Sequence, residues 1–325
     1  MLYKKIYLGM LLLAGSAFAF AAGTGEKNDP QNVLKSIQLA AQKLSYSGTF
    51  VYQQASQIRT SRITHVNDGG NEIEKLEILD GKPREYIRRN DEVSCYLPEQ
   101  KLVQVEKDVN PESFPALLTQ NAQALAEIYH IRKGESARVA GLDCQTYLLD
   151  PKDGFRYGYK LCADKNSNLL LRAQTVNTRN EVIEQIAFTQ LQVGDIDRTK
   201  LKPGFNGVAN WRIENLTVQS NISSGWIVKQ LPAGYKKTKE IKRLISGGAG
   251  GKTHPVIQMT FSDGLGAFSV FVEPDSEGRT EGSIQQGAMN ITARRVGDAW
   301  ITVVGEVPAS VVRQVVSSLE FRPVK

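Results

Sequence analysis

The stretch that decides the fold class is TFVYQQASQIRTSRITHVNDGGNEIEKLEILDGKPREYIRRNDEVSCYLPEQKLVQVE, residues 49–106. It contains six short runs in which apolar and polar residues alternate: 49–53, 59–66, 72–79, 84–89, 92–97 and 102–106. Turn-forming residues separate these runs, among them Asp80-Gly81 and Asn90-Asp91. Period-two alternation between tight turns predicts a meander of antiparallel strands, each with one buried face.

Helical and strand patterns flank this meander. Asp29-Pro30 is a helix-start signal ahead of an apolar face, and Asn110-Pro111 opens a second helical segment that carries Phe114, Leu117, Leu118, Leu125 and Ile128. Further strands are expected at 137–140, 144–149, 155–163, 169–177 and 182–193. We therefore expect one large, curved antiparallel half-barrel sheet with helices on its concave face. Its apolar interior could hold an acyl chain or be filled by the helices.

A second, smaller unit follows. The residues between 200 and 215 include Pro203-Gly204 and Asn206-Gly207 and predict a linker. Strand patterns follow at 226–230, 235–245, 256–261, 267–273, 288–296 and 300–306, with a hairpin-like turn at 231–234. Pro308 begins a final helix. The predicted organisation is a signal peptide at 1–22, a large domain at 23–199, a linker at 200–215 and a small α+β domain at 216–325.

The N-terminus indicates the compartment. Lys4 and Lys5 precede an apolar run at 6–13, and small residues then lead through Ala17-Phe18-Ala19 and Ala21-Ala22. This order is typical of a cleavable secretory signal, and a buried N-terminal helix is the alternative. We therefore expect an exported, periplasmic protein.

The basic residues are unevenly distributed. Residues 23–204 hold 24 basic and 24 acidic residues, whereas residues 205–325 hold 14 basic and 10 acidic ones. The surplus includes a local cluster: Lys236, Lys237, Lys239, Lys242 and Arg243. In an exported protein such a cluster favours an anionic lipid, lipopolysaccharide or an acidic partner segment over nucleic acid. A solvated strand face is the alternative interpretation.

The three cysteines all lie in the N-terminal half of the chain. Cys144 and Cys162 flank a turn at 150–154, and a hairpin centred on residue 153 would place them opposite each other. A Cys144–Cys162 disulfide with Cys95 free is the preferred pairing in an oxidising compartment. Pairing of Cys95 with either of the others, or three reduced cysteines, remain alternatives.

The sequence contains no complete motif for catalysis or for cofactor binding. The glycine-rich residues 247–253 resemble a phosphate-binding loop, but Ser246 stands where the motif requires glycine, and a strand pattern follows. His65, His130 and His254 lack the spacing of a metal site, and there is no Gly-x-Ser-x-Gly motif. We therefore expect a binding protein without cofactor or metal, not an enzyme.

Several short motifs carry a resemblance to a known family. They are Phe50-Val51-Tyr52, Arg62-Ile63-x-His65, residues 79–88, Phe114-Pro115-Ala116-Leu117, residues 150–159, Leu169-Leu170-Leu171 and Gly305-Glu306-Val307-Pro308. In order and spacing, across nearly the whole chain after the signal, they resemble the MucB/RseB family of periplasmic sigma-E regulators.

The resemblance implies both a fold and a function. It implies an N-terminal domain similar to the lipoprotein carriers LolA and LolB, followed by a smaller C-terminal domain. It also implies binding to the periplasmic part of an anti-sigma factor of the RseA/MucA type, protection of that factor from site-1 proteolysis, and release on a lipid signal. That signal would be lipopolysaccharide or lipoprotein acyl chains. A lipoprotein or lipid carrier is the competing function, and homo-oligomerisation stays open.

The meander also suggests polar contacts for a partner or lipid. Arg62, Arg84, Glu85 and Arg88 are expected to cluster because their strands are adjacent. Salt bridges across an exposed sheet face would explain the same residues equally well.

Overall fold

The structure is a computed structural model that describes residues 30–107, 114–118, 122–216, 218–220, 222–246, 253–275 and 278–323. The predicted signal peptide lies outside the described residues. No helix in the described part of the chain is long and apolar enough to cross a membrane.

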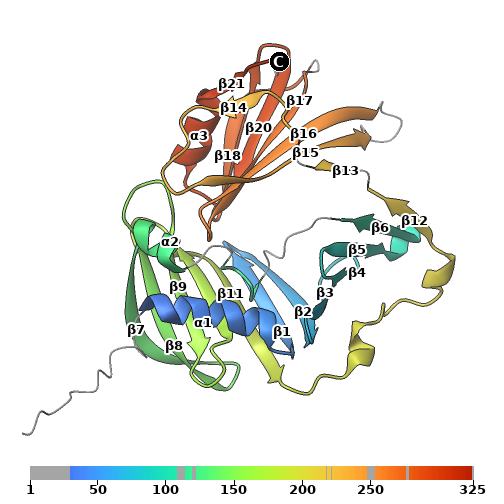
Figure 1. Cartoon of the computed structure of the whole chain (residues 1–325), viewed down its shortest axis with the longest axis vertical. Coiled ribbons are helices and arrows are strands. Elements are labelled where there is room, and N and C mark those ends of the chain that lie inside the picture. Colours follow the sequence, from blue (N-terminus) through green and yellow to red (C-terminus); the bar gives the residue numbers. More distant parts are fainter. Residues whose placement is uncertain are drawn as a thin grey trace, which may run out of the picture.

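A twelve-stranded sheet forms the large domain (Figure 1). Its strands are β1 (Tyr46–Gln54), β2 (Gln57–Asp68), β3 (Asn71–Ile78), β4 (Arg84–Arg89), β5 (Glu92–Leu97), β6 (Leu102–Glu106), β7 (Tyr129–Val139), β8 (Leu142–Pro151), β9 (Gly158–Asp164), β10 (Leu170–Val176), β11 (Val182–Val193) and β12 (Arg212–Asn215). Their order is β12-β6-β5-β4-β3-β2-β1-β11-β10-β9-β8-β7. β1 therefore joins two meanders, since it pairs antiparallel with both β2 and β11.

The concave face of this sheet is filled by side chains. Helix α1 (Pro30–Lys43) and the short helix α2 (Ala122–Ile128) lie on it, and Leu34, Ile37 and Leu125 are fully buried there. Phe114 packs between Phe50 and Phe188, with ring centroids 5.4 and 4.9 Å away. The large curved sheet with helices on its concave face is as predicted, and the packing fills its interior.

The second helix is shorter than expected. Residues 114–118 are not helical, and α2 begins only at Ala122. Pro115 accounts for the non-helical Phe114, because proline disfavours the helical conformation of the residue before it. Phe114 and Leu118 still reach the core, so the apolar pattern predicted burial correctly and helix incorrectly.

The convex face is covered by the segment predicted to be a linker. Residues 196–211, which we call the outer strap, contain two short 3-10 turns, η2 (Arg198–Leu201) and η3 (Val208–Asn210). Ile196 and Leu201 pack on Val66, whereas Phe205, Val208 and Trp211 pack on the cluster around Ile87. The chain then forms β12, which pairs in parallel with β6. The linker is therefore packed against the outside of the large sheet.

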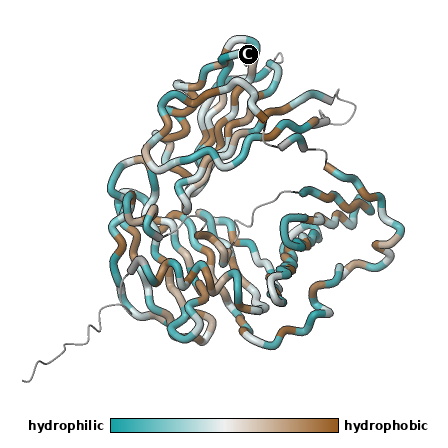
Figure 2. The backbone as a smooth tube through the Cα atoms, in the orientation of Figure 1, coloured by the Kyte–Doolittle hydropathy of each residue, from teal (hydrophilic) through white to brown (hydrophobic). Residues whose placement is uncertain are grey.

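A seven-stranded sheet forms the small domain. It comprises β13 (Val218–Ser220), β15 (Lys236–Ser246), β16 (Thr253–Ser262), β17 (Ala267–Pro274), β18 (Gly282–Gln286), β19 (Met289–Val296) and β20 (Ala299–Gly305) in the order β13-β15-β16-β17-β20-β19-β18. Helix α3 (Ala309–Ser317) packs its valines on one face. Apolar and polar residues alternate along the strands of both sheets (Figure 2).

Two strand predictions in the outer regions were wrong. The hairpin expected around residues 231–234 is absent, because β14 (Trp226–Val228) pairs with β21 (Leu319–Phe321) instead of with β15. β7 begins at Tyr129, eight residues before the predicted strand. Tyr129-His130-Ile131-Arg132 alternates as a strand does, but the polar residues 133–136, where the register shifts, interrupt the apolar pattern before residue 137.

The disulfide between Cys144 and Cys162 is present, and its Cα atoms lie 5.5 Å apart. The register differs from the predicted one, since Cys144 pairs with Asp164 and Cys162 with Thr146. The bridge is therefore diagonal, and the hairpin centres on residue 154 because the β8–β9 loop is longer than a tight turn. Cys95 is free.

Candidate binding cleft between the domains

The loop between β8 and β9 joins the two domains. It carries Arg156, whose side chain is only 1% exposed. The Arg156 guanidinium donates to Asp153 within the loop and, across the domain boundary, to Asp263 at 2.8 Å and to the Ala233 carbonyl at 2.6 Å. It also lies against the rings of Tyr129 and Tyr235. This residue therefore holds a turn of the small domain against the large one.

The carboxylates around Arg156 are well provided with donors. Asp263 accepts from the backbone N–H groups of Leu265 and Gly266 as well as from Arg156. Although burial opposes ionisation of Asp153, hydrogen bonds from Arg156 and the Phe155 N–H lower its pKa. Burial has the larger effect at Asp263, where desolvation raises the pKa despite the hydrogen bonds that the carboxylate accepts.

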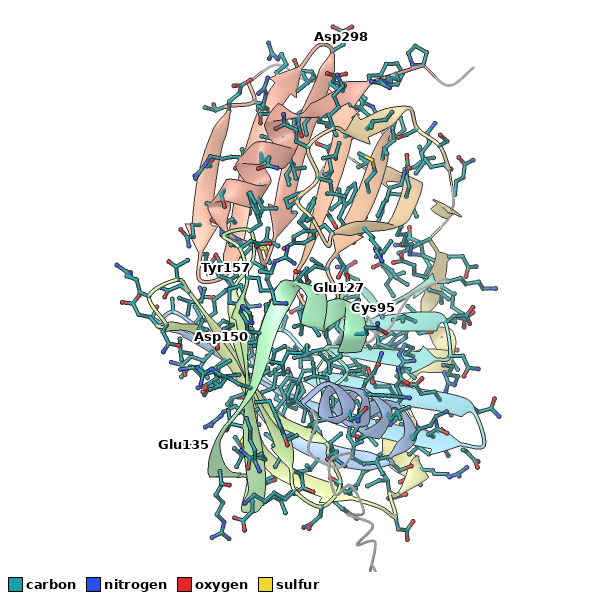
Figure 3. All side chains as sticks on the ribbon, turned by 60° about the vertical axis from the view of Figure 1, so that its left-hand side comes forward. Cys95, Glu127, Glu135, Asp150, Tyr157 and Asp298 are labelled. Atoms are coloured by element: carbon teal, nitrogen blue, oxygen red, sulfur yellow. A yellow bond between two sulfur atoms is a disulfide. The ribbon has the colours of Figure 1, made fainter. Side chains whose placement is uncertain are left out.

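A second set of contacts lies beside Arg156. Figure 3 shows Tyr157 at the boundary between the large and small domains. Its hydroxyl accepts from the Asn290 side-chain amide, which also donates to the Val307 carbonyl at 2.9 Å. The Gln54 amide of β1 donates to the Gln286 carbonyl of the small domain. The motif segments 150–159 and 305–308, far apart in sequence, therefore meet at this boundary.

Beside these contacts lies an open cleft with a volume of about 490 Å³. The face of the small sheet opposite α3 forms most of its wall, and Leu117 contributes from the large domain. Apolar lining residues such as Phe271 and Val304 alternate with polar ones such as Thr260 and Ser269. Such a wall can contact both apolar and polar side chains of a ligand. Glu306 is the charged residue of the described lining, and none of the described lining residues is basic.

A buried carboxylate lies near the same boundary. Glu184 of β11 is 8% exposed, and Tyr52 and Gln54 hydrogen-bond to its side chain. Its second oxygen, Oε2, has no partner among the described residues. Desolvation and the charge of Glu306 raise the pKa of Glu184 to about 7. Desolvation also raises the pKa of Glu306, which remains exposed at the cleft.

The four predicted contact residues of the meander do not form one cluster. Strand register places Arg62 and Glu85 on the outer face of the sheet, and Arg84 and Arg88 on the inner face. Glu85 is buried under the outer strap, where it binds the Lys75 ammonium at 3.1 Å and accepts from the Gly204 N–H. Arg62 faces Glu77 at 3.9 Å. The expected single cluster is therefore wrong.

On the inner face, Arg88 is buried in an ion-pair network. Its guanidinium donates to Glu72 at 2.6 Å and Glu74 at 3.4 Å, and His65 lies 2.9 Å from Glu72. Burial opposes ionisation of Glu72, but the bonds from His65 and Arg88 lower its pKa to about 2. Ligand atoms of His65, Glu72 and Glu74 lie within 4.8 Å of one another, yet the Arg88 cation between the carboxylates disfavours a metal ion there. Arg84 is exposed and donates to the Tyr86 hydroxyl.

The basic residues of β15 are divided between the two faces of the small sheet. Register places Lys239 and Arg243 on the cleft side and Lys237 and Lys242 on the α3 side. Lys237 pairs with Glu240, Lys239 lies 3.9 Å from Glu106, and Arg243 donates to Gln258. Lys236 and Lys242 are exposed. The local cluster in the sequence is therefore divided between two faces, and contact of these residues with a partner or lipid stays a prediction.

A larger cavity, of about 660 Å³, lies between the outer strap and strands β1–β3. Its charged lining residues are Arg62, Lys75, Glu77, Lys200 and Lys202. A Cβ at Gly204, at its edge, would lie 2.7 Å from the Glu85 carboxylate, which would have to shift. The Lys75 ammonium binds Glu85 and the Lys202 carbonyl, so its charge is committed to holding the strap.

Sequence reasoning missed the residues that line the boundary. Arg156 and Glu306 stand within motif segments but had received no role. Glu184 had a readable signal, because it occupies an inward position of β11 in line with Ile186 and Phe188. A lone acidic residue on an apolar strand face indicates a buried carboxylate.

Comparisons with known proteins match both domains. The family model for the MucB/RseB N-terminal domain matches residues 29–205, and the one for the C-terminal domain matches residues 220–320. The sigma-E factor regulatory protein RseB of Haemophilus influenzae is 26% identical over 98% of this chain and 100% of its own. The sigma factor AlgU regulatory protein MucB of Pseudomonas aeruginosa is 29% identical over 97% of this chain and 96% of its own.

A solved structure extends the likeness to the arrangement of the chain. The crystal structure of MucB in complex with MucA(peri) matches with a TM-score of 0.70 and 26% identity, and covers 91% of this chain and 100% of that one. Both family models match here in order, and the first alone spans more than half of the chain. The protein belongs to the MucB/RseB family.

Proposed function

We propose that this protein is a periplasmic negative regulator of a sigma-E-type envelope-stress response. It binds the periplasmic part of a membrane anti-sigma factor of the RseA/MucA type and shields it from site-1 proteolysis. The observation that carries the proposal is the match, over both domains, to a MucB whose structure was solved in complex with MucA(peri). The interdomain cleft supplies a binding surface consistent with it.

The bound segment lies in the cleft between the domains. The wall of the small sheet presents both apolar and polar residues to the segment, and the cleft volume of about 490 Å³ accommodates several side chains. Enclosure between two domains would remove the segment from the reach of a protease. The contacts of Arg156 and Asn290 fix the width of the cleft.

Release follows binding of a lipid signal. The concave interior of the large sheet is filled by α1, α2 and residues 114–118, so an acyl chain must displace some of these side chains. Such displacement would couple lipid binding to the domain boundary, since Leu117 lines the cleft and Ile128 contacts Gly234 of the small domain. Coupling of about 1–3 kcal/mol would be typical.

Calorimetric titration of the mature protein with the periplasmic segment of its own anti-sigma factor tests this function. We expect saturable binding that weakens when lipopolysaccharide or a lipopeptide is added. Phe271→Asp, in the cleft, should weaken binding at least tenfold, whereas Leu39→Lys, on the exposed side of α1, should not. Circular dichroism of both variants controls for folding.

The competing function is a lipid or lipoprotein carrier. Lipid binding and transfer between membranes, with no binding of the segment at any concentration, would replace the regulator by the carrier. Protection of the segment from site-1 protease in the presence of the protein would exclude this outcome.

A further inference from the structure

In the described part of the chain, the twelve-stranded and seven-stranded sheets end in four edge strands: β7, β12, β13 and β18. Three of them are protected against pairing with another strand. β7 carries charged residues, among them Arg132 and Lys133, and its register with β8 shifts after Lys133. β12 carries Arg212 and Glu214, and β13 has only three residues. Charge, bulges and shortness are devices that keep an edge strand from accepting a new one.

The fourth edge strand, β18, has none of these devices. Its sequence, Gly-Ser-Ile-Gln-Gln, contains no charged residue and no proline, and its register with β19 is unbroken. All five of its residues are exposed, and the side chain of Ile284 is 70% exposed. β18 is therefore a regular, uncharged strand that pairs with β19 on one side and is open on the other in the described structure.

The hairpin that joins β18 to β19 determines which backbone groups face the open edge. Its loop is Gly287-Ala288, and Gly287 has the positive φ of 57° that a type II′ turn requires at its first central position. The pair that closes such a turn is hydrogen-bonded, and hydrogen-bonded pairs alternate along an antiparallel ladder. Ser283 and Gln285 therefore direct their backbone N–H and C=O groups away from β19. The hydroxyls of Ser283 and Thr292 lie 2.9 Å apart, as expected for a pair without backbone hydrogen bonds.

The open edge adjoins the interdomain cleft. Gln286 of β18 pairs with Met289, which lines the cleft. Ile284 pairs with Ile291, and Ile291 pairs with Val304 of the cleft wall. Because paired residues share one face of a sheet, Ile284 lies on the cleft side. An extended chain that leaves the cleft past Met289 would run beside β18 and keep alternate side chains on this face.

We propose that β18 accepts one extended strand of the segment that the cleft binds, so that the small sheet gains a further strand. The occupant is the periplasmic segment of the anti-sigma factor, and in this respect the proposal rests on the proposed function. The outward N–H and C=O groups of Ser283 and Gln285 bond to the backbone of the segment, and these bonds contribute affinity that does not depend on its side chains. Ile284 contacts alternate side chains of the added strand and supplies sequence preference.

Gln285→Pro and Gln285→Ala form a matched pair of variants for the test. Both remove the amide side chain, but only proline removes the outward N–H, and an edge strand tolerates proline where that N–H faces solvent. In calorimetric titrations of the mature protein, we expect Gln285→Pro to bind the segment about tenfold more weakly than the wild type and Gln285→Ala to bind it with unchanged affinity. Circular dichroism of both variants controls for folding. Equal affinity of the two variants would overturn the proposal and leave the proposed function in place.

Hydrogen exchange of the wild type tests the same bonds without a substitution. On saturation with the segment, the backbone amides of Ser283 and Gln285 should exchange at least tenfold more slowly. The amide of Ile213, which faces the open edge of β12 because the N–H groups of Arg212 and Leu216 bond to the β6 side, should not change. Unprotected Ser283 and Gln285 amides in a saturated complex would overturn the proposal alone.

Two further outcomes are distinguishable in the same samples. If the segment does not bind to the wild type, both the proposal and the proposed function fall. If the amides of Ser283 and Gln285 are protected without the segment and analytical ultracentrifugation shows dimers, the edge pairs with a second copy of the chain, and the proposal is overturned.

Discussion

Arg156 and Glu184 lie at the same domain boundary, and the protein treats these two buried charges in opposite ways. Arg156 has two carboxylates and a carbonyl as acceptors, whereas Glu184 has two neutral donors and an oxygen without a partner. A fully paired charge fixes the position of the domains. A buried charge with too few partners is unfavourable, and a ligand can relieve this. Arg156 is therefore structural, whereas Glu184 is suited to binding.

Loss of Arg156 should have the largest effect. Arg156→Met leaves Asp263 buried without its cation and should destabilise the protein by about 3–5 kcal/mol. Denaturant unfolding gives the change in free energy, and small-angle scattering should show the domains farther apart. Arg156→Met combined with Asp263→Asn should recover part of the stability, because asparagine removes the buried charge while its side-chain oxygen can still accept from the Leu265 and Gly266 N–H groups.

The exposed pair Arg132–Asp150 on the neighbouring strands is the control for charge loss. Arg132→Ala should cost less than 1 kcal/mol, since solvent screens this pair. If Arg156→Met behaved like Arg132→Ala, the boundary would not depend on the buried pair.

The disulfide comes next, because it ties the hairpin that carries Arg156. Replacing Cys144 and Cys162 by serine removes the closure of an 18-residue separation and should cost about 3 kcal/mol. The domain spacing in scattering should change less than in Arg156→Met. A larger change would mean that the hairpin, and not the ion pair, sets the domain position.

The contrast between these regions also shows what the sequence could predict. Strands β4, β5, β6 and β11 match their predicted bounds, because period-two alternation and flanking turns are local signals. The disulfide could be inferred from the hairpin, although its register was wrong by one residue at the centre. The resemblance then led to the family.

Contacts between distant segments could not be predicted in the same way. The outer strap reads as a linker because its apolar residues, such as Phe205 and Trp211, follow neither a helical nor a strand period. The pairing of β14 with β21 joins residues about ninety positions apart, and nothing in either segment specifies the other. Arg156 and Asp263 likewise acquire their roles only when the domains meet.

Glu184→Gln should change the free energy of unfolding less than Arg156→Met does. The change should depend on pH, and it should stabilise the protein. Its folded pKa, about 7, exceeds the ordinary value of 4.5, so its contribution is fully present below pH 4.5 and is lost as the pH rises through 7. Glu184→Gln should therefore be more stable than the wild type by about 2 kcal/mol at pH 8.5 and by little at pH 5. Unfolding by urea at the two pH values measures this, and a constant difference would contradict it.

Tyr52→Phe should have the smallest effect on the free energy of unfolding. It tests which group sets the pKa of Glu184. The Tyr52 hydroxyl donates to the ionised Glu184 carboxylate, so its loss should raise the pKa of Glu184 further and cost about 1 kcal/mol at pH 8.5. At pH 5 the carboxyl is protonated and the cost should nearly vanish. In the Glu184→Gln background the pH dependence should be absent, since the acceptor no longer titrates. NMR titration of the Glu184 carboxyl carbon in the wild type and in Tyr52→Phe measures the change in pKa directly. An unchanged titration midpoint would mean that water, and not Tyr52, hydrogen-bonds to the Glu184 carboxylate. Glu184 would then have more hydrogen-bond partners than the contrast with Arg156 assumes.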